Sequence, residues 1–310
     1  MSIQYADTKM LDLARRLTGW VPAPWGASTV VHAYESAIRG VADLAGLRLG
    51  PTPLHWERTG SGPPVLLIMG LGLSGGAWWR TVPVLARRLD VITFDNRGVG
   101  RSRALFQAYT TEAMSDDAVS VLDAAGVERA HVYGISLGGM VAQQLALRHP
   151  ERVRSLVLGA THAGGPQLHW PDFEVLDFLR RRLRMRPEEG AWSSVAFNYG
   201  ERCRREHPER IAEDVAQRLA HPFPEQAYRA QLWAGALHDT AGGLHRIAAP
   251  TLVVHGREDR MIPVENGRLL AERIPNAELL EVEGCGHLYP TEAPHIDEAI
   301  ADFMHRHSAT

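Results

Sequence analysis

Ser136 lies at the centre of the pentapeptide Gly134-Ile135-Ser136-Leu137-Gly138, a spacing that is typical of a catalytic nucleophile. The apolar run His131–Tyr133 precedes it and the helical stretch LGGMVAQQLALRHP follows it, so the pattern predicts a strand, a tight turn and a helix. Such a turn strains the serine backbone, and glycines two residues away on either side remove side chains that would collide. The helix N-terminus would also favour negative charge on a reacting oxygen. An ordinary serine N-cap is the alternative interpretation.

The partners that would activate this serine are expected further along the chain, because a hydroxyl is a weak nucleophile until a base takes its proton. Asp259 follows the apolar run TLVVHG, and His287 lies in GCGHLYP just beyond the last apolar run. The order serine, acid, histidine therefore predicts a triad of Ser136, Asp259 and His287. Glu258 is the alternative acid, although a shift of one residue directs its side chain elsewhere.

Two backbone amides are predicted to form an oxyanion hole. One belongs to Leu137, which follows the nucleophile, and the other to Leu71 in the glycine-rich loop GLGLSGG after the run VLLIM. The glycines give the loop the freedom to aim an amide inward. A phosphate-binding interpretation of this loop fails, because no Gly-Lys-Ser/Thr follows and Trp78-Trp79 replaces the expected basic residue.

The elements that must position these residues alternate between short apolar runs and longer amphipathic stretches. Near-continuous apolar runs predict strands of a parallel sheet covered on both faces, and the alternation predicts a doubly wound α/β fold. The expected strands are Val65–Met69, Val91–Phe94, His131–Tyr133, Ser155–Leu158, Thr251–Val254 and Glu278–Val282. The expected helices are Trp78–Arg88, Thr110–Ala125, Leu137–Arg148, Gly267–Arg273 and one near Pro294–His305.

Two regions break this alternation. Residues 164–243 are helix-biased and rich in arginine and aromatic residues, and their place between two expected strands predicts a helical cap over the ligand crevice. Ordinary packing helices are the alternative. The core then comprises residues 47–163 and 244–310. Residues 1–46 are expected to form an N-terminal extension with a short amphipathic helix, which would serve packing or dimer contact rather than a membrane surface. Leu47–Leu49 with Leu54–Trp56 predict an antiparallel edge.

Composition narrows the classes of partner. A formal net charge of -3 and a pI near 6.6 give no global attraction to nucleic acid or anionic lipid, so a small-molecule substrate is expected. Cys203 and Cys285 are too few for a disulfide framework and are expected to be free thiols. The first residues lack the pattern of a secretory signal and no apolar stretch is long enough to span a bilayer, so a cytoplasmic protein is expected. A homo-oligomer is compatible with this composition.

Further motifs resemble the α/β-hydrolase superfamily. FDNRGVGRS (Phe94–Ser102) is similar to a structural turn of that family, and HPERVRSLVL (His149–Leu158) is also family-like. The resemblance runs from about residue 47 to the C-terminus, cap excepted, and implies that neither a metal nor an organic cofactor is required. Met69-Gly70 stands where many members have His-Gly, a variant found among polyketide methylesterases, which the chain resembles loosely.

The expected reaction is hydrolysis of a small to medium, mainly apolar carboxylic ester through an acyl-enzyme. A serine nucleophile argues against dehalogenases and epoxide hydrolases, which use aspartate at that place. The same triad also serves lactonases, thioesterases, C–C bond hydrolases and perhydrolases, and a non-catalytic ligand receptor is the alternative from another class. Aromatic side chains of the cap are candidates for lining the pocket, although their helical spacing is also typical of packing: Trp170, Phe173, Trp192, Phe197, Tyr199 and Trp233.

Overall fold

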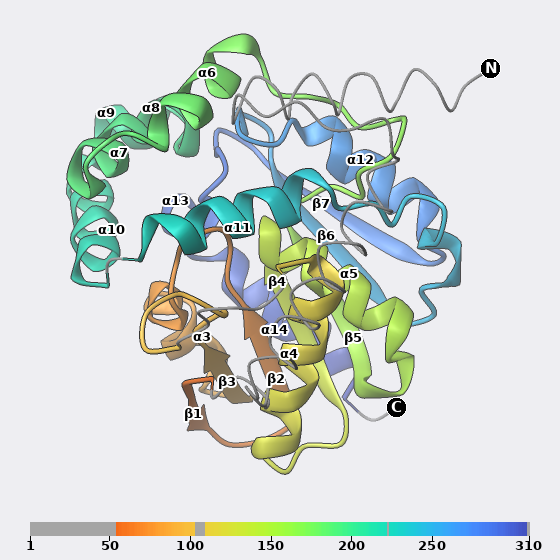
Figure 1. The fold of residues 1–310 in the computed structure, drawn as a ribbon. Coiled ribbons are helices and arrows are strands. Elements are labelled where there is room, and N and C mark those ends of the chain that lie inside the picture. The colour runs from red at the N-terminus through yellow and green to blue at the C-terminus, as the bar shows by residue number, and fades with distance from the viewer. Residues whose placement is uncertain (1–53, 103–108, 222, 309–310) are drawn as a thin grey trace, which may run out of the picture.

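The computed structural model describes residues 54–102, 109–221 and 223–308, which fold around one seven-stranded sheet (Figure 1). The strand order is β1-β3-β2-β4-β5-β6-β7, with β1 antiparallel to β3 and every other pairing parallel. The strands are β1 (Trp56–Gly60), β2 (Pro64–Ile68), β3 (Asp90–Phe94), β4 (Ala130–Ile135), β5 (Val153–Gly159), β6 (Thr251–Gly256) and β7 (Ala277–Val282). The predicted doubly wound, mostly parallel sheet is confirmed.

Helices cover both faces of the sheet, which explains why its strands are apolar on both sides. In β2, Leu66 and Ile68 join one buried cluster and Val65 and Leu67 join the other, as the two-residue repeat of a strand requires. The first cluster includes residues of α4 (Thr111–Ala124), α5 (Leu137–Arg148) and α12 (Val264–Arg273). The second includes residues of α3 (Val82–Leu85) and α14 (Ile296–Arg306).

Two predicted elements differ from the structure. The helix expected over Trp78–Arg88 is a 3₁₀ turn, η1 (Gly75–Trp78), followed by the single turn α3. Pro83 lacks the N–H that a continuous helix would need there, so it occupies the first turn of a new helix instead. The antiparallel edge strand begins at Trp56, where the predicted segment ends, because its outward polar residues give little apolar signal. Residues 1–46 and Leu47–Leu49 lie outside the described residues.

The stretch between β5 and β6 is helical in the described residues. It contains α6 (Phe173–Arg182), α7 (Pro187–Ser193), α8 (Val195–Asn198), α9 (Glu201–Glu206), α10 (Pro208–Ala220) and α11 (Glu225–Ala236), here called the cap helices. They have a small core of their own, made by Ala191, Tyr199, Cys203, Ile211 and Val215. Figure 1 shows α6–α10 gathered beyond one end of the sheet, with α11 leading back across it. The predicted domain bounds at 164 and 243 stay a prediction.

Candidate active site

Ser136 sits between β4 and α5 with a backbone conformation that side chains rarely adopt, φ 57° and ψ −122°. Such a conformation costs about 1–3 kcal/mol and persists only where the surroundings fix it. Its N–H donates to the carbonyl of Gly159 at 2.8 Å, and its carbonyl accepts from the Thr161 hydroxyl at 2.8 Å and from the Gly139 N–H at 2.9 Å. The turn therefore holds the serine side chain at one position.

Glycines around this turn are required by close backbone contacts, as the sequence predicted. A Cβ on Gly134 would lie 2.1 Å from the carbonyl oxygen of Gly138, and one on Gly138 would lie 2.0 Å from that of Ile68. A Cβ on Gly139 would lie 2.7 Å from the Thr161 side chain. Each distance is too short for a real contact, so α5 can approach the sheet this closely only without those side chains.

His287 and Asp259 meet at the neighbouring strand ends. The Nδ1 atom of His287 lies 2.8 Å from Oδ2 of Asp259, and both side chains are buried. A carboxylate only accepts hydrogen bonds, so Nδ1 carries the proton and Nε2 is left as the basic nitrogen. Glu258, the alternative acid, is exposed, and its Oε2 accepts from the Glu201 N–H at 2.9 Å. The geometry therefore favours Asp259.

Asp259 is held ionised by its surroundings. Burial raises its pKa, but the charge of His287 and hydrogen bonds from His255 and His287 outweigh burial, and the net pKa is lowered. Its Oδ1 accepts from the Ile262 N–H at 2.9 Å. His255, which the sequence analysis did not single out, donates from Nε2 to the Ile262 carbonyl at 2.8 Å and lies 3.3 Å from Oδ2 of Asp259. The acid is thus fixed by contacts on both oxygens.

The loops that carry the acid and the histidine pack backbone against backbone. A Cβ on Gly256 would lie 2.2 Å from the carbonyl oxygen of Gly286, and the Glu258 N–H donates to the Cys285 carbonyl at 2.8 Å. Gly256 ends β6, so a larger residue there would push the two loops apart. The distance between Asp259 and His287 therefore depends on a glycine that no motif had indicated.

The two residues predicted to supply the oxyanion hole are Leu137, which directly follows Ser136, and Leu71, which lines the same cavity. Leu137 is the first residue of α5 and Leu71 lines the same cavity as Ser136, and neither backbone N–H donates a hydrogen bond to another described residue. The nearest part of the loop is Gly70, where a Cβ would lie 3.7 Å from Oγ of Ser136. Both amides are thus free to bind an oxygen that develops charge.

The family-like turn after β3 holds the glycine-rich loop in place. The carboxylate of Asp95 accepts from the Gly75 N–H at 2.8 Å, and the side-chain amide of Asn96 donates to the Met69 carbonyl at 2.9 Å. On the other side, Gln231 of α11 accepts from the Gly72 N–H at 2.9 Å. Met69 therefore needs no polar side chain to fix the loop, since its backbone carbonyl makes the contact.

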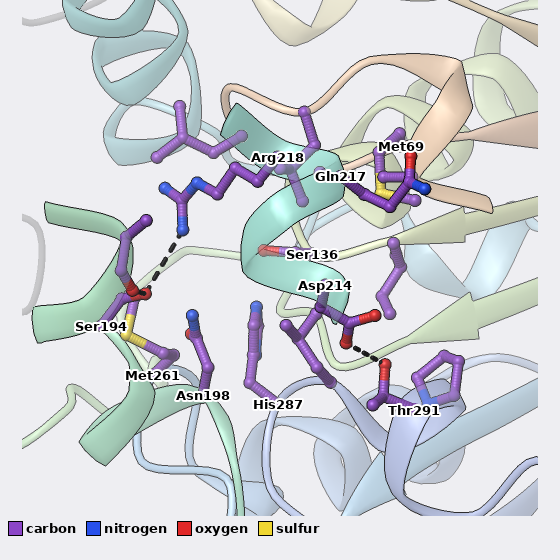
Figure 2. A pocket seen from close by; sticks show the side chains of 18 of the residues that line it. Met69, Ser136, Ser194, Asn198, Asp214, Gln217, Arg218, Met261, His287 and Thr291 are labelled. Atoms are coloured by element: carbon purple, nitrogen blue, oxygen red, sulfur yellow. Dashed lines mark hydrogen bonds between the residues drawn. The ribbon is translucent and has the colours of Figure 1, made fainter. Parts of the chain in front are cut away.

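A cavity of about 150 Å³ lies where the strands end and the cap helices begin, and Ser136 and His287 both line it (Figure 2). A closed apolar cavity of this size holds a group as large as benzene. Most of its wall is apolar, with Met69, Trp78, Ile135, Phe178 and Val215 among the lining residues. The Ser136 hydroxyl makes no hydrogen bond within the described part of the chain.

Two arginines on the cavity wall have different surroundings. Arg80 forms ion pairs with Glu213 at 2.6 Å and with Asp214 at 3.3 Å. Arg218 of α10 forms no ion pair with any described residue, and its guanidinium donates only to the Ser194 hydroxyl at 3.3 Å. Burial lowers the pKa of Arg218, so its charge lies in a poorly solvated place without a counterion. Figure 2 shows this side chain on the cap side of the cavity that His287 faces from the core.

A family model described as the alpha/beta hydrolase fold matches residues 63–294, which include the serine turn, the acid and the histidine. The chain belongs to the α/β-hydrolase family. In this α/β-hydrolase, Ser136, Asp259 and His287 follow the carboxyl ends of β4, β6 and β7 of one sheet, and ligands bind at this edge of open α/β sheets.

Similar proteins carry names of several hydrolases. RutD of Azorhizobium caulinodans, named for carbamate hydrolysis, is 34% identical over 80% of this chain and 92% of its own. The 2-hydroxymuconate semialdehyde hydrolase of Pseudomonas sp. strain CF600 is 34% identical over 84% of this chain and 91% of its own. Among solved structures, a thermophilic esterase from Thermogutta terrifontis has a TM-score of 0.71 and 29% identity, covering 83% of this chain and 97% of that one.

Several side chains considered from the sequence can now be placed. Of the six aromatic residues considered for the pocket, only Tyr199 lines the cavity, while Phe173 is 71% and Trp192 48% exposed. Cys203 and Cys285 are free and buried, as expected. None of the described helices has the length and apolar character to cross a membrane, and the described side chains include no group of three or more His, Cys, Asp or Glu that could hold a metal ion.

Proposed function

We propose that this α/β-hydrolase cleaves a carboxylic ester through an acyl-enzyme on Ser136. The observation that carries the proposal is the shared cavity: Ser136 and His287 face it, and Asp259 lies 2.8 Å behind the histidine. A nucleophile, a base and an orienting acid in this arrangement are what acyl transfer needs.

The reaction then follows from the positions of the groups. Nε2 of His287 takes the proton of the Ser136 hydroxyl, and the oxygen attacks the ester carbonyl. The amides of Leu71 and Leu137 donate to the tetrahedral oxyanion, while Asp259 stabilises the imidazolium. The histidine returns the proton to the leaving alcohol, and the same groups activate the water that releases the acid.

The cavity supports a small, largely apolar acyl group with one negative charge. Its volume of about 150 Å³ and its apolar wall favour a short chain or a single ring. Arg218 has no ion-pair partner among the described residues, and a guanidinium binds a carboxylate in a bidentate geometry. We therefore assign Arg218 to binding of an anionic group of the substrate.

Arg218, which has no ion-pair partner among the described residues, also favours a second candidate function, hydrolysis of a C–C bond in an acidic substrate. The Pseudomonas relative is named for a muconate semialdehyde, which by its name carries a carboxylate. Both candidates use the triad of Ser136, Asp259 and His287, and they differ only in the bond that the bound substrate presents.

A stopped-flow assay with two four-carbon acyl donors tests the proposal. The p-nitrophenyl ester of butyrate is neutral, and the p-nitrophenyl hemiester of succinate carries a carboxylate. We expect rapid release of nitrophenolate from both, with the hemiester giving the higher kcat/KM. Release no faster than the buffer blank from either ester would rule out ester hydrolysis. Turnover of a muconate semialdehyde alone would establish the second candidate.

A further inference from the structure

The loop that carries His287 rests directly on the cap. A Cβ on Gly286 would lie 2.9 Å from the carbonyl oxygen of Asn198 and 3.0 Å from the nitrogen of Gly200. The Leu288 N–H also donates to the Asn198 carbonyl at 3.0 Å. Residues 284–288, here called the histidine loop, and residues 198–200, here called the cap seat, therefore pack backbone against backbone on both sides of the histidine.

The carboxylate of Glu292 lies in this contact and joins its two sides. Oε1 accepts from the Gly286 N–H at 2.7 Å, and Oε2 accepts from the Gly200 N–H at 2.8 Å. Glu292 ends α13 (Tyr289–Glu292) and is only 6% exposed. Gly286 immediately precedes His287. The Glu292 side chain therefore fixes both the backbone next to His287 and the position of the cap seat.

We propose that Glu292 is a positioning residue, whose carboxylate ties the cap seat to the histidine loop and so holds His287 in alignment with Ser136. This inference rests on the proposed function, because it assigns His287 as the base. It adds a residue that touches neither the substrate nor the triad side chains, and it links the substrate-binding cap to the chemistry.

The chemistry of the two partners explains why a carboxylate is needed. Both partners are backbone donors, so the side chain must accept on both oxygens, which an ionised carboxyl does. An amide or a protonated carboxyl presents a donor on one side, and one of the two bonds is lost. The structure offers no other reason for a charge here, since no described residue forms an ion pair with Glu292. A buried carboxylate without a cation is costly, so these two bonds are its main compensation.

The ionisation of Glu292 falls in the neutral range. Its pKa is raised to about 7, because burial and the carboxylates of Glu258 and Asp259 raise it by more than the bonds from Gly286 and Gly200 lower it. The charged groups that act on it are Glu258 and Asp259, which follow β6, and the thiols of Cys203 on α9 and Cys285 on the histidine loop lie near enough to be affected by its charge.

The two consequences of this ionisation have opposite signs. The folded pKa lies above the ordinary value of 4.5, so the contribution of Glu292 to stability is complete below about pH 4.5 and is lost as the pH rises through about 7. The two hydrogen bonds, in contrast, are both present only above about pH 7. As the pH rises through about 7, we therefore expect the alignment of His287 to improve while the contribution of Glu292 to stability is lost.

The experiment compares Glu292→Gln with Glu283→Gln in the full chain. Glu283 is an exposed carboxyl three residues before Gly286, and its substitution removes the same charge without touching the cap seat. At pH 8 we expect Glu292→Gln to lower kcat for the p-nitrophenyl ester about 10- to 100-fold, because a small displacement of a catalytic group has effects of this size. Glu283→Gln should keep kcat within twofold.

A pH profile separates positioning from simple packing. Wild-type kcat should fall as the pH drops through about 7 and Glu292 is protonated, whereas Glu292→Gln should lose this part of the profile. The melting temperature of Glu292→Gln at pH 8 should stay high enough for the variant to be folded in the assay, so unfolding does not account for the lower kcat. If Glu292→Gln does not fold, Glu292→Asp keeps the charge but shortens the reach to one N–H, and it should show the same loss of kcat.

Hydrogen exchange gives a readout that does not depend on activity. Peptides covering residues 198–203 and 284–288 should both exchange faster in Glu292→Gln than in wild type and in Glu283→Gln. Unchanged exchange in both peptides, or wild-type kcat at every pH, would overturn the inference. If the wild type is inert but both peptides exchange faster in Glu292→Gln, the proposed function is rejected. The inference that Glu292 connects the cap seat to the histidine loop is then retained.

Discussion

The predicted triad and the charged side chains of α10 are held by different means. On the core side, Ser136, Asp259 and His287 follow strands, and the loops between them touch through backbone atoms. On the cap side, Arg218 and Asp214 reach the cavity from α10, and side chains alone hold them. The difference teaches that the groups proposed to break the bond should tolerate almost no change around them, whereas the side chains proposed to bind the substrate should be replaceable one at a time.

The largest expected effect comes from the acid. Asp259→Asn should lower kcat by about 10⁴-fold, because an amide no longer holds the Nδ1–H tautomer of His287 or stabilises its cation. Glu258→Gln should have a small effect by comparison, since Glu258 contacts the Glu201 N–H and not His287. Steady-state kinetics of both variants on the same ester check this. Equal losses in the two variants would contradict the assignment of Asp259 as the acid.

A backbone substitution tests the claim that the core side is rigid. Gly256→Ala would place a Cβ 2.2 Å from the carbonyl oxygen of Gly286, so the free energy of unfolding should fall by about 1–3 kcal/mol or more. Gly242→Ala is the matched control in the region between the cap helices and β6, where a Cβ would meet nothing within 4 Å. The control should be neutral or stabilised by about 0.4–1 kcal/mol. Chemical denaturation measures both, and equal stability of the two variants would argue against rigid loop packing.

A smaller and more selective effect is expected on the cap side. Arg218→Gln should lower kcat/KM for the succinate hemiester about 10- to 100-fold, since hydrogen bonds to charged groups contribute about 1.5–3 kcal/mol. The neutral butyrate ester should change little. Arg180→Gln removes an exposed arginine of the cap that pairs with Asp177, and it should leave both esters unchanged. A parallel loss on both esters in Arg218→Gln would mean that this arginine supports the cap rather than the substrate.

Patterns local in sequence were enough to predict the sheet and the place of the candidate site. Leu66 and Ile68 belong to a run that is apolar on both faces, and Gly134 and Gly138 flank a serine at a strand-to-helix turn. These features depend on neighbours within a few residues. The prediction of one helix over Trp78–Arg88 was wrong, and the reason is also local, because Pro83 interrupts the helix.

The residues that sequence reasoning missed depend on distant contacts. Gly256 meets Gly286, Gln231 binds Gly72, and Glu292 binds Gly200, and each pair is separated by 30 or more residues in the chain. The aromatic residues of the cap could not be sorted for the same reason, since helical spacing does not indicate which face meets the cavity. The one signal in the sequence for Arg218 was the large number of arginines in the cap. Of these, Arg218 lines the cavity and has no ion-pair partner among the described residues.

The central claim is that Ser136 is the nucleophile, and covalent labelling tests it most directly. Wild type and Ser136→Ala are incubated with a fluorophosphonate, and the intact mass and the labelled peptide are measured. Wild type should gain one adduct per chain on the peptide containing Ser136, and Ser136→Ala should gain none while keeping the melting temperature of the wild type. An unlabelled wild type, or an adduct that persists in Ser136→Ala, would contradict the claim.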